Sequence, residues 1–120
     1  MTKRISTIAL IAIVVFLGTY SGAILAETGM AVYYSDKFQG RKTASGDVFD
    51  QNQLTAAHKK FPFGTRIKVT NLENDRSVIV KINDRMASKN SNIIDITRRA
   101  AKELDFVKQG KTRVSLEEVD

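Results

Sequence analysis

The chain has 120 residues, with 19 lysine and arginine residues against 13 aspartate and glutamate residues, one histidine and no cysteine. This length favours a single folded domain. The absence of cysteine excludes disulfides, thiolate metal sites, a cysteine nucleophile and lipidation of an N-terminal cysteine, so we do not expect a lipoprotein. A single histidine excludes any metal site that needs two imidazoles, and we expect neither a metal nor an organic cofactor.

Residues 1–26 are typical of a secretory signal peptide. They hold 17 hydrophobic residues and two charges, Lys3 and Arg4, which precede an unbroken apolar run. The small residues near the end of this segment predict cleavage after Ala26, with a cut after Ala23 as the alternative. An uncleaved anchor stays open, because a charge-free stretch of roughly 20 residues can span a bilayer. In either case we expect residues 27–120 to be exported to the periplasm or the cell wall, with membrane contact only through an uncleaved N-terminal segment.

The exported part contains several short stretches that alternate between apolar and polar residues, as half-buried strands do. Strands are predicted over residues 30–34, 66–70, 77–82, 92–96 and 113–117. Thr97 is a candidate N-cap for a helix of about ten residues, in which Ala100, Ala101 and Leu104 share one face. A chain of this size with mostly β content must close or stack its sheet, and a small barrel is the expected solution.

Polar residues that are candidates for catalysis or ligand binding lie between these predicted elements. Residues 37–50 are rich in glycine and small polar side chains and predict a loop with a short extended stretch. The single histidine, His58, follows a small apolar run, and Asp84 follows the most apolar of the predicted strands. A carboxylate at the end of a strand is well placed to line a cleft on a rigid support. Asp95 lies inside an apolar run, and we expect it to be structural, accepting backbone hydrogen bonds or pairing with an arginine.

Five sequence blocks occur in a distinctive order. They are Gly40-Arg41-x-Thr43-Ala44-Ser45-Gly46, Leu54-Thr55-Ala56-Ala57-His58, Val69-Thr70-Asn71-Leu72, Asn83-Asp84-Arg85 and Ile94-Asp95-Ile96-Thr97. This series resembles the RlpA-like (rare lipoprotein A) family, from about Gly29 to Glu117. The resemblance implies a mainly β fold, a six-stranded double-psi β-barrel with one or two short helices, over residues 27–120. It also implies an endolytic peptidoglycan transglycosylase, and hence peptidoglycan glycan strands as the partner.

The resemblance also implies a catalytic site of three residues: Asp84, His58 and Asp47, the last standing where the family usually has glutamate. A lytic transglycosylase cleaves between MurNAc and GlcNAc, and the 6-hydroxyl of the muramic acid closes onto its own anomeric carbon to leave a 1,6-anhydro end. One carboxyl group can deliver a proton to the leaving oxygen and then accept the hydroxyl proton. We assign this role to Asp84, with His58 orienting it or stabilising charge and Asp47 contacting the sugar or tuning Asp84. A lone histidine is also commonly a structural hydrogen-bond partner.

Four further residues are candidates for substrate binding. Tyr33 and Tyr34 offer flat faces to sugar rings, although aromatic side chains are more commonly buried. Arg41 and Arg85 can contact a substrate carboxylate or support the walls of the cleft.

Departures from the family pattern keep a second class of function open. Met86-Ala87-Ser88 stands where the family usually has a Gly-Pro turn, and Ser91-Asn92 replaces Gly-Arg. The alternative is a non-catalytic glycan-binding module of the cell envelope, and a hydrolase with the same fold is a third possibility. The exported part has 17 basic and 13 acidic residues. This modest positive charge suits an anionic wall polymer, whereas nucleic acid is not expected. We expect a monomer.

Overall fold

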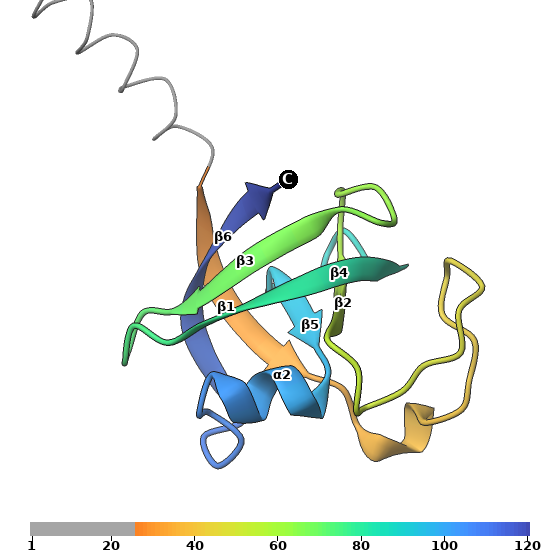
Figure 1. Ribbon diagram of the computed structural model, residues 1–120, viewed down its shortest axis with the longest axis horizontal. Coiled ribbons are helices and arrows are strands. Elements are labelled where there is room, and N and C mark those ends of the chain that lie inside the picture. The colour runs from red at the N-terminus through yellow and green to blue at the C-terminus, as the bar shows by residue number, and fades with distance from the viewer. Residues whose placement is uncertain (1–25) are drawn as a thin grey trace, which may run out of the picture.

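The computed structural model describes residues 26–120, so the predicted signal peptide, apart from Ala26, lies outside the described residues. Six strands form a closed barrel, together with a short 3-10 helix and a short α-helix (Figure 1). The elements are β1 (Glu27–Tyr33), η2 (Asp36–Phe38), β2 (Thr55–His58), β3 (Arg66–Asn71), β4 (Ser77–Arg85), β5 (Ile94–Ile96), α2 (Arg98–Glu103) and β6 (Lys111–Val119). The expected mainly β barrel of six strands is confirmed.

The strands follow the order β1-β5-β2-β4-β3-β6 around the barrel, so neighbours in space are mostly not neighbours in sequence. β1 pairs with β5 and β2 with β4 in parallel, and the other pairs are antiparallel. The sequence missed β2, whose four residues are too few to show alternation. The helix α2 has six residues where about ten were expected. Leu104 is its C-cap, and the helix ends there because Asp105 has a positive φ of 58°, which a right-handed helix cannot accommodate.

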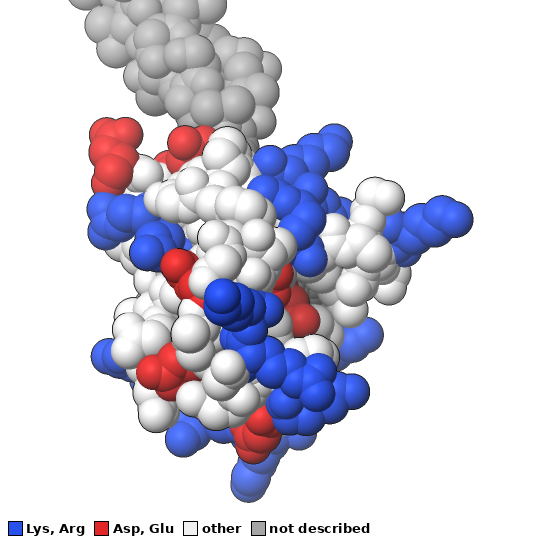
Figure 2. Space-filling model, turned by 90° about the vertical axis from the view of Figure 1, so that its right-hand side faces the viewer, with Lys and Arg blue, Asp and Glu red and all other residues white. Residues whose placement is uncertain are grey.

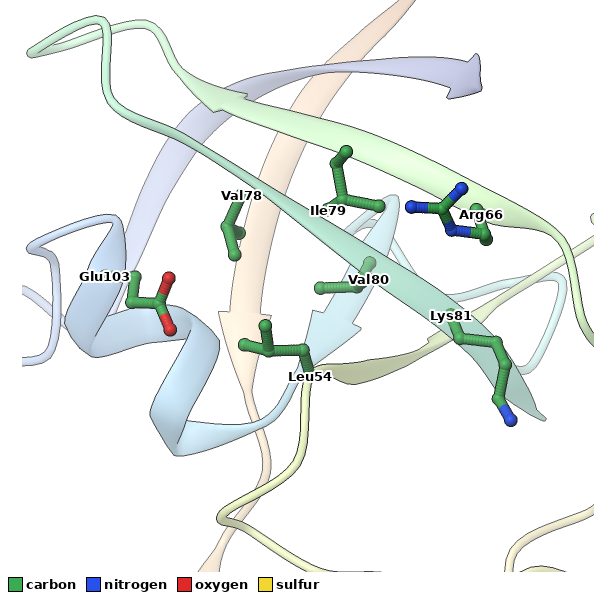
Figure 3. Close-up of a pocket in the computed structure, with 7 residues that line it drawn as sticks. All are labelled: Leu54, Arg66, Val78, Ile79, Val80, Lys81 and Glu103. Carbon is green, nitrogen blue, oxygen red and sulfur yellow. The ribbon is translucent and has the colours of Figure 1, made fainter. Parts of the chain in front are cut away.

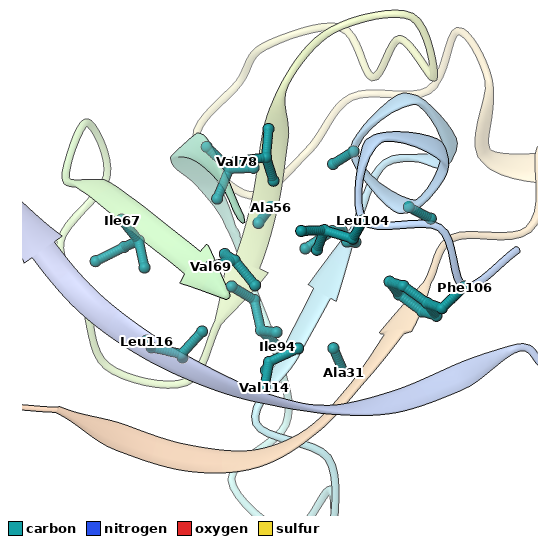
Figure 4. Close-up of a cluster of buried hydrophobic side chains, with 14 of the residues drawn as sticks. Ala31, Ala56, Ile67, Val69, Val78, Ile94, Leu104, Phe106, Val114 and Leu116 are labelled. Atoms are coloured by element: carbon teal, nitrogen blue, oxygen red, sulfur yellow. The ribbon is translucent and has the colours of Figure 1, made fainter. Parts of the chain in front are cut away.

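The barrel interior holds one hydrophobic cluster, to which every strand and α2 contribute (Figure 4). In β4 the inward side chains are Val78, Val80 and Ile82, as alternation requires. Burial of each such side chain contributes roughly 1.5–3 kcal/mol, so a closed barrel of this size needs no disulfide. Ala100 and Ala101 of helix α2 pack in this cluster. Thr97 is the N-cap of the helix, as the sequence predicted.

The alternation in β4 breaks once, at Asn83. Ala56 of β2 pairs with Ile82, but the next residue, Ala57, pairs with Asp84, so Asn83 is an extra residue on the β4 side. Such a β-bulge turns the following side chain to the other face of the sheet. Asp84 consequently faces out of the barrel, although its place in the sequence alternation would have put it inside.

The segment between β1 and β2 lies against the outside of the barrel, at the right in Figure 1. It contains η2 and an isolated bridge between Lys42 and Val48, in agreement with the predicted loop and its short extended stretch. A second small hydrophobic cluster fixes it to the barrel wall and consists of Tyr34, Phe49, Ala57 and Met86. Within residues 26–120, no helix is long and apolar enough to cross a membrane.

Candidate functional site

Two aspartates lie on the outer face of the barrel, on either side of one alanine. Ala57 of β2 pairs with Asp84 of β4 and, on its other side, with Asp95 of β5. Directly paired residues in neighbouring strands point to the same face of a sheet. The bulge at Asn83 is therefore what brings the carboxyl groups of Asp84 and Asp95 onto one surface.

A cleft of about 350 Å³ lies over these two aspartates, between the barrel wall and the loop that follows β1. It is lined by Tyr34, Phe38, Arg41, Lys42, Ala57, Asp84, Arg85, Met86, Asn90 and Asp95. Three of these side chains are cationic and two are carboxylates. Basic side chains are numerous on the side of the molecule where this loop lies, with acidic atoms set between them (Figure 2). Such a cleft suits an elongated, polar and partly anionic ligand.

The carboxylate of Asp84 is held by groups from three parts of the chain. The hydroxyl of Tyr34 donates to its Oδ2 at 2.6 Å. The backbone N–H groups of Ala44 and Arg85 donate to its Oδ1 at 2.8 and 2.9 Å. The loop and the barrel wall thus meet at this one side chain, whose orientation is fixed before any ligand arrives.

Asp95 has a different environment from the one that its sequence context suggested. Its Oδ1 is buried and has no hydrogen-bond partner among residues 26–120, so the expectation of a structurally bonded aspartate is wrong for this oxygen atom. Burial, together with the nearby negative charge of Asp84, raises the pKa of Asp95 from 3.8 to about 7. Asp95 was not among the predicted site residues, although an acid within the run Ile93-Ile94-Asp95-Ile96 was a visible signal.

The two neighbouring tyrosines point to opposite sides of the barrel wall. Tyr34 is buried in the cleft, where its ring packs against Phe49 with centroids 4.3 Å apart. Burial and the hydrogen bond to Asp84 raise the pKa of its hydroxyl, which therefore stays protonated and acts as a donor. Tyr33 instead packs on the core, and its hydroxyl donates to the carbonyl of Val107 at 2.9 Å. Of the two predicted sugar-binding tyrosines, the structure places only Tyr34 in the cleft.

The structure does not bring His58 into the cleft. His58 pairs with Ile94, a core residue, and so lies on the opposite face from Asp84. Its Nδ1 accepts hydrogen bonds from the backbone N–H groups of Lys60 and Phe61, both at 3.0 Å. Since Nδ1 is an acceptor, the proton of the neutral ring is on Nε2, which lies 3.0 Å from Oε1 of Glu27. The ring is also stacked on Phe61, and the side chain is 4% exposed.

Of the other three predicted site residues, Arg41 and Arg85 line the cleft, and Asp47 is not among the lining residues. Asp47 is exposed in the loop, and its Oδ2 accepts a hydrogen bond from Nδ2 of Asn83, the bulge residue, at 3.4 Å. Arg41 lines the cleft, with its guanidinium 5.8 Å from the ring centroid of Phe38. Arg85 also lines the cleft, but its Nη1 donates to the carbonyls of His58 and Phe61 at 3.0 and 2.8 Å. Arg85 therefore supports the turn after β2.

A larger hollow, of about 470 Å³, runs along β4 beside α2 (Figure 3). Its lining is mainly aliphatic, from Leu54, Val78, Ile79 and Val80, with Glu103 at one end and two basic side chains at the other. A single carboxylate without a second acid or a fixed donor offers little chemistry, so the smaller cleft is the better candidate site. Within residues 26–120, no group of three or more potential metal ligands is present.

A family model described as lytic transglycolase matches residues 26–116. A protein of Treponema pallidum (strain Nichols), named probable endolytic peptidoglycan transglycosylase RlpA, is 42% identical over 120 residues, which are 100% of this chain and 38% of the relative. The endolytic peptidoglycan transglycosylase RlpA of Rickettsia bellii (strain RML369-C) is 50% identical over 94 residues, which are 76% of this chain and 41% of the relative. The chain thus spans about two fifths of the length of these curated relatives.

Solved structures share the fold at lower sequence identity. The Streptomyces papain inhibitor superposes with a TM-score of 0.64 at 22% identity, over 81% of this chain and 96% of the inhibitor. The apo expansin of Clavibacter michiganensis gives a TM-score of 0.63 at 20% identity, over 80% of this chain and 51% of the expansin. The fold is the double-psi β-barrel that was expected.

Proposed function

Because the chain belongs to the lytic transglycolase family, we propose that it is an endolytic peptidoglycan lytic transglycosylase, a carbon–oxygen lyase that acts on glycan strands. The curated relatives carry this activity in their names, and the chain matches them over one part of their length. The substrate, peptidoglycan, implies that the protein works in the cell envelope after export. The monomer expected from sequence stays a prediction. The cleft over Asp84 is the site of this reaction.

The observation that carries the proposal is the pair of outward-facing carboxyl groups, Asp84 and Asp95, which share the cleft with several cationic side chains. Cleavage of a glycosidic bond needs a proton for the leaving oxygen and an acceptor for the proton of the attacking hydroxyl. Two carboxyl groups of unlike environment can meet both needs. Arg41 and Lys42, which line the cleft, can pair with the carboxylate of the muramic acid.

Within this site we assign Asp84 to proton transfer with the substrate. Its oxygen atoms are fixed by Tyr34 and by the backbone of Ala44, so its reach into the cleft is constrained. Tyr34 serves as a donor to Asp84, and its ring forms part of the cleft wall. Asp47 is exposed beside the bulge, and we keep it as a proposed contact to the sugar. His58 holds the turn after β2 and contributes to the reaction only through the fold.

One observation favours a non-catalytic glycan-binding module instead. Both oxygen atoms of Asp84 already accept hydrogen bonds from the protein, as expected of a residue that joins the loop to the barrel. In such a module the cleft binds glycan strands, and no bond is broken.

Incubation of the purified protein with glycan strands stripped of their stem peptides, followed by mass spectrometry of the products, separates these functions. A transglycosylase gives 1,6-anhydro ends, a hydrolase gives ordinary reducing ends, and a binding module leaves the strands intact while retaining them. We expect anhydro ends and a loss of roughly 10²–10⁴-fold in rate for Asp84→Asn. Asp105→Asn is the matched control, because Asp105 is an exposed acid that pairs with Arg76 outside the cleft. Equal rates for Asp84→Asn and the wild type would overturn the assignment of Asp84.

A further inference from the structure

The paired strands give the cleft a second carboxyl group at a defined position. Asp84 and Asp95 flank Ala57 directly, on β4 and β5. Neighbouring strands are about 4.8 Å apart, which puts the two backbones about 9.6 Å apart, and both side chains extend from the same face. Both aspartates line the same cleft, while Ala57 between them is buried against Tyr34 and Met86. Part of a sugar residue bound in this cleft can therefore lie against both carboxyl groups.

The hydrogen-bond partners of the two carboxyl groups are not alike. Asp84 accepts hydrogen bonds from the hydroxyl of Tyr34 and from the backbone N–H groups of Ala44 and Arg85, so both of its oxygen atoms are already acceptors. Asp95 has a buried oxygen atom that receives no hydrogen bond from residues 26–120. An ionised carboxylate without a donor costs more free energy at such a position than a protonated carboxyl group does.

The charged surroundings favour a proton on Asp95 as well. Burial and the negative charge of Asp84 raise its pKa to about 7. The titratable and charged groups that line the same cleft are Tyr34, Arg41, Lys42, Asp84 and Arg85. Tyr34 donates to Asp84 and Arg85 donates to the carbonyls of His58 and Phe61, so these two partners are engaged elsewhere. A substantial fraction of Asp95 therefore carries a proton at neutral pH.

We propose that Asp95 is the general acid of the cleavage reaction and that Asp84 is the base. This inference rests on the proposed transglycosylase function and divides between two residues the role that sequence had given to Asp84 alone. The carboxyl group of Asp95 gives its proton to the glycosidic oxygen as the bond from that oxygen to the anomeric carbon of MurNAc breaks. The 6-hydroxyl oxygen of the same MurNAc bonds to the anomeric carbon, and its proton passes to Asp84.

The step consumes no water and needs no further reactant. The products are a 1,6-anhydro end and a free 4-hydroxyl on GlcNAc, and the proton gained by Asp84 balances the proton lost by Asp95. Return of one proton from Asp84 to Asp95 restores the starting state. The difference in environment between the two carboxyl groups favours this return.

A change of leaving group distinguishes a general acid from a structural aspartate. On stem-peptide-free glycan strands we expect Asp95→Asn to lose roughly 100-fold or more in kcat with KM nearly unchanged. A 4-nitrophenyl β-glycoside of MurNAc has a leaving group that departs without a proton. On this substrate Asp95→Asn should stay within about tenfold of the wild type, whereas Asp84→Asn should be impaired on both substrates.

Further variants keep the test decisive. Asp95→Glu retains a carboxyl group and should recover part of the lost rate on glycan strands, and Asp105→Asn should match the wild type on both substrates. Wild-type cleavage of glycan strands by Asp95→Asn, or an equal loss on both substrates, would overturn the role of Asp95. Failure of the wild type itself to cleave glycan strands would instead overturn the proposed function.

Discussion

Ala57 and His58 are consecutive residues of β2, yet they belong to two polar regions of opposite character. On the side of Ala57 lies the cleft, where Asp95 has an oxygen atom that receives no hydrogen bond from the described residues. On the side of His58, each ring nitrogen has a protein partner, and the ring is stacked on Phe61. Both regions contain residues of the family motifs, so motif membership alone does not distinguish a chemical role from a structural one.

The two regions differ in whether their polar groups have all their hydrogen-bond partners inside the protein. A polar group whose hydrogen bonds are all satisfied inside the protein adds to stability and has little left to offer a ligand. A polar group left without a partner carries a free-energy cost that a ligand or a proton can relieve. By this criterion Asp95 marks the cleft as the reactive region, although Asp84 beside it is already hydrogen-bonded, and the His58 region holds together the turn between β2 and β3.

Substitution of His58 gives the largest expected change in stability. We expect His58→Ala to lower the free energy of unfolding by about 2–4 kcal/mol, because it leaves the N–H groups of Lys60 and Phe61 without their acceptor and opens a cavity beside Phe61. The rate per folded molecule should stay within about threefold of the wild type, since His58 faces away from the cleft. Urea unfolding and single-temperature activity measurements test the two parts of this prediction.

Glu27→Gln is the matched control for that substitution. It keeps an acceptor near Nε2 of His58 on a side chain that is 44% exposed, so its effect on stability should be under about 1 kcal/mol. If His58→Ala instead kept full stability and lost most of its activity, the contrast between the two regions would be broken.

Asp95 should make the stability of the protein depend on pH in a defined direction. Its pKa is about 7 in the folded protein against 3.8 ordinarily, so the folded state binds the proton more tightly. The stability that Asp95 contributes is complete below about pH 4 and is lost as the pH rises to about 7. Because the side chain of Asp95→Asn cannot ionise, the stability of this variant relative to the wild type should increase as the pH rises over the same range.

The expected gain at pH 8 is roughly 1–3 kcal/mol, less than the full value of such a pKa shift because the cleft admits water. Thermal unfolding at pH 5 and pH 8 measures it, with Asp105→Asn expected to show no comparable change. A variant that is less stable than the wild type at every pH would mean that Asp95 is a structural acceptor after all.

The sequence predicted most of the fold, because its strands alternate clearly. The stretches 66–70 and 77–82 are extended as expected, and Thr97 caps the helix as expected. The four residues of β2 escaped detection because they are few and because three consecutive residues of this strand are buried, so apolar and polar positions do not alternate. The helix was predicted too long, because nothing in its pattern marked Asp105 as a residue of positive φ.

The candidate site was harder to predict, because it depends on one register shift. Sequence alternation ended this strand at residue 82 and placed Asp84 just after it, whereas β4 runs to Arg85. It could not show that Asn83 is a bulge that turns Asp84 outward. The same limitation concealed the split between Ala57 and His58, which depends on their pairing with β5. Asp95 was noticed as unusual in an apolar run, and only the pairing of the strands places it beside Asp84.

The smallest expected effect comes from the two adjacent tyrosines, of which one lies in the cleft and the other packs on the core. Tyr34→Phe keeps the packing on Phe49 but removes the hydroxyl that donates to Oδ2 of Asp84. We expect the rate on glycan strands to fall by roughly 3–10-fold, in keeping with the roughly 1 kcal/mol net value of one hydrogen bond.

Tyr33→Phe is the control, since it removes a hydroxyl of the same kind that bonds to the carbonyl of Val107 on the opposite side of the wall. It should cost a similar amount of stability, about 0.5–1.5 kcal/mol, and leave the rate unchanged. Equal rates for the two variants would show that the hydroxyl of Tyr34 serves the fold and not the reaction. A rate loss confined to Tyr34→Phe would instead locate the chemistry on the side of the barrel wall that carries Asp84, because the two substitutions differ in little but the direction of the side chain.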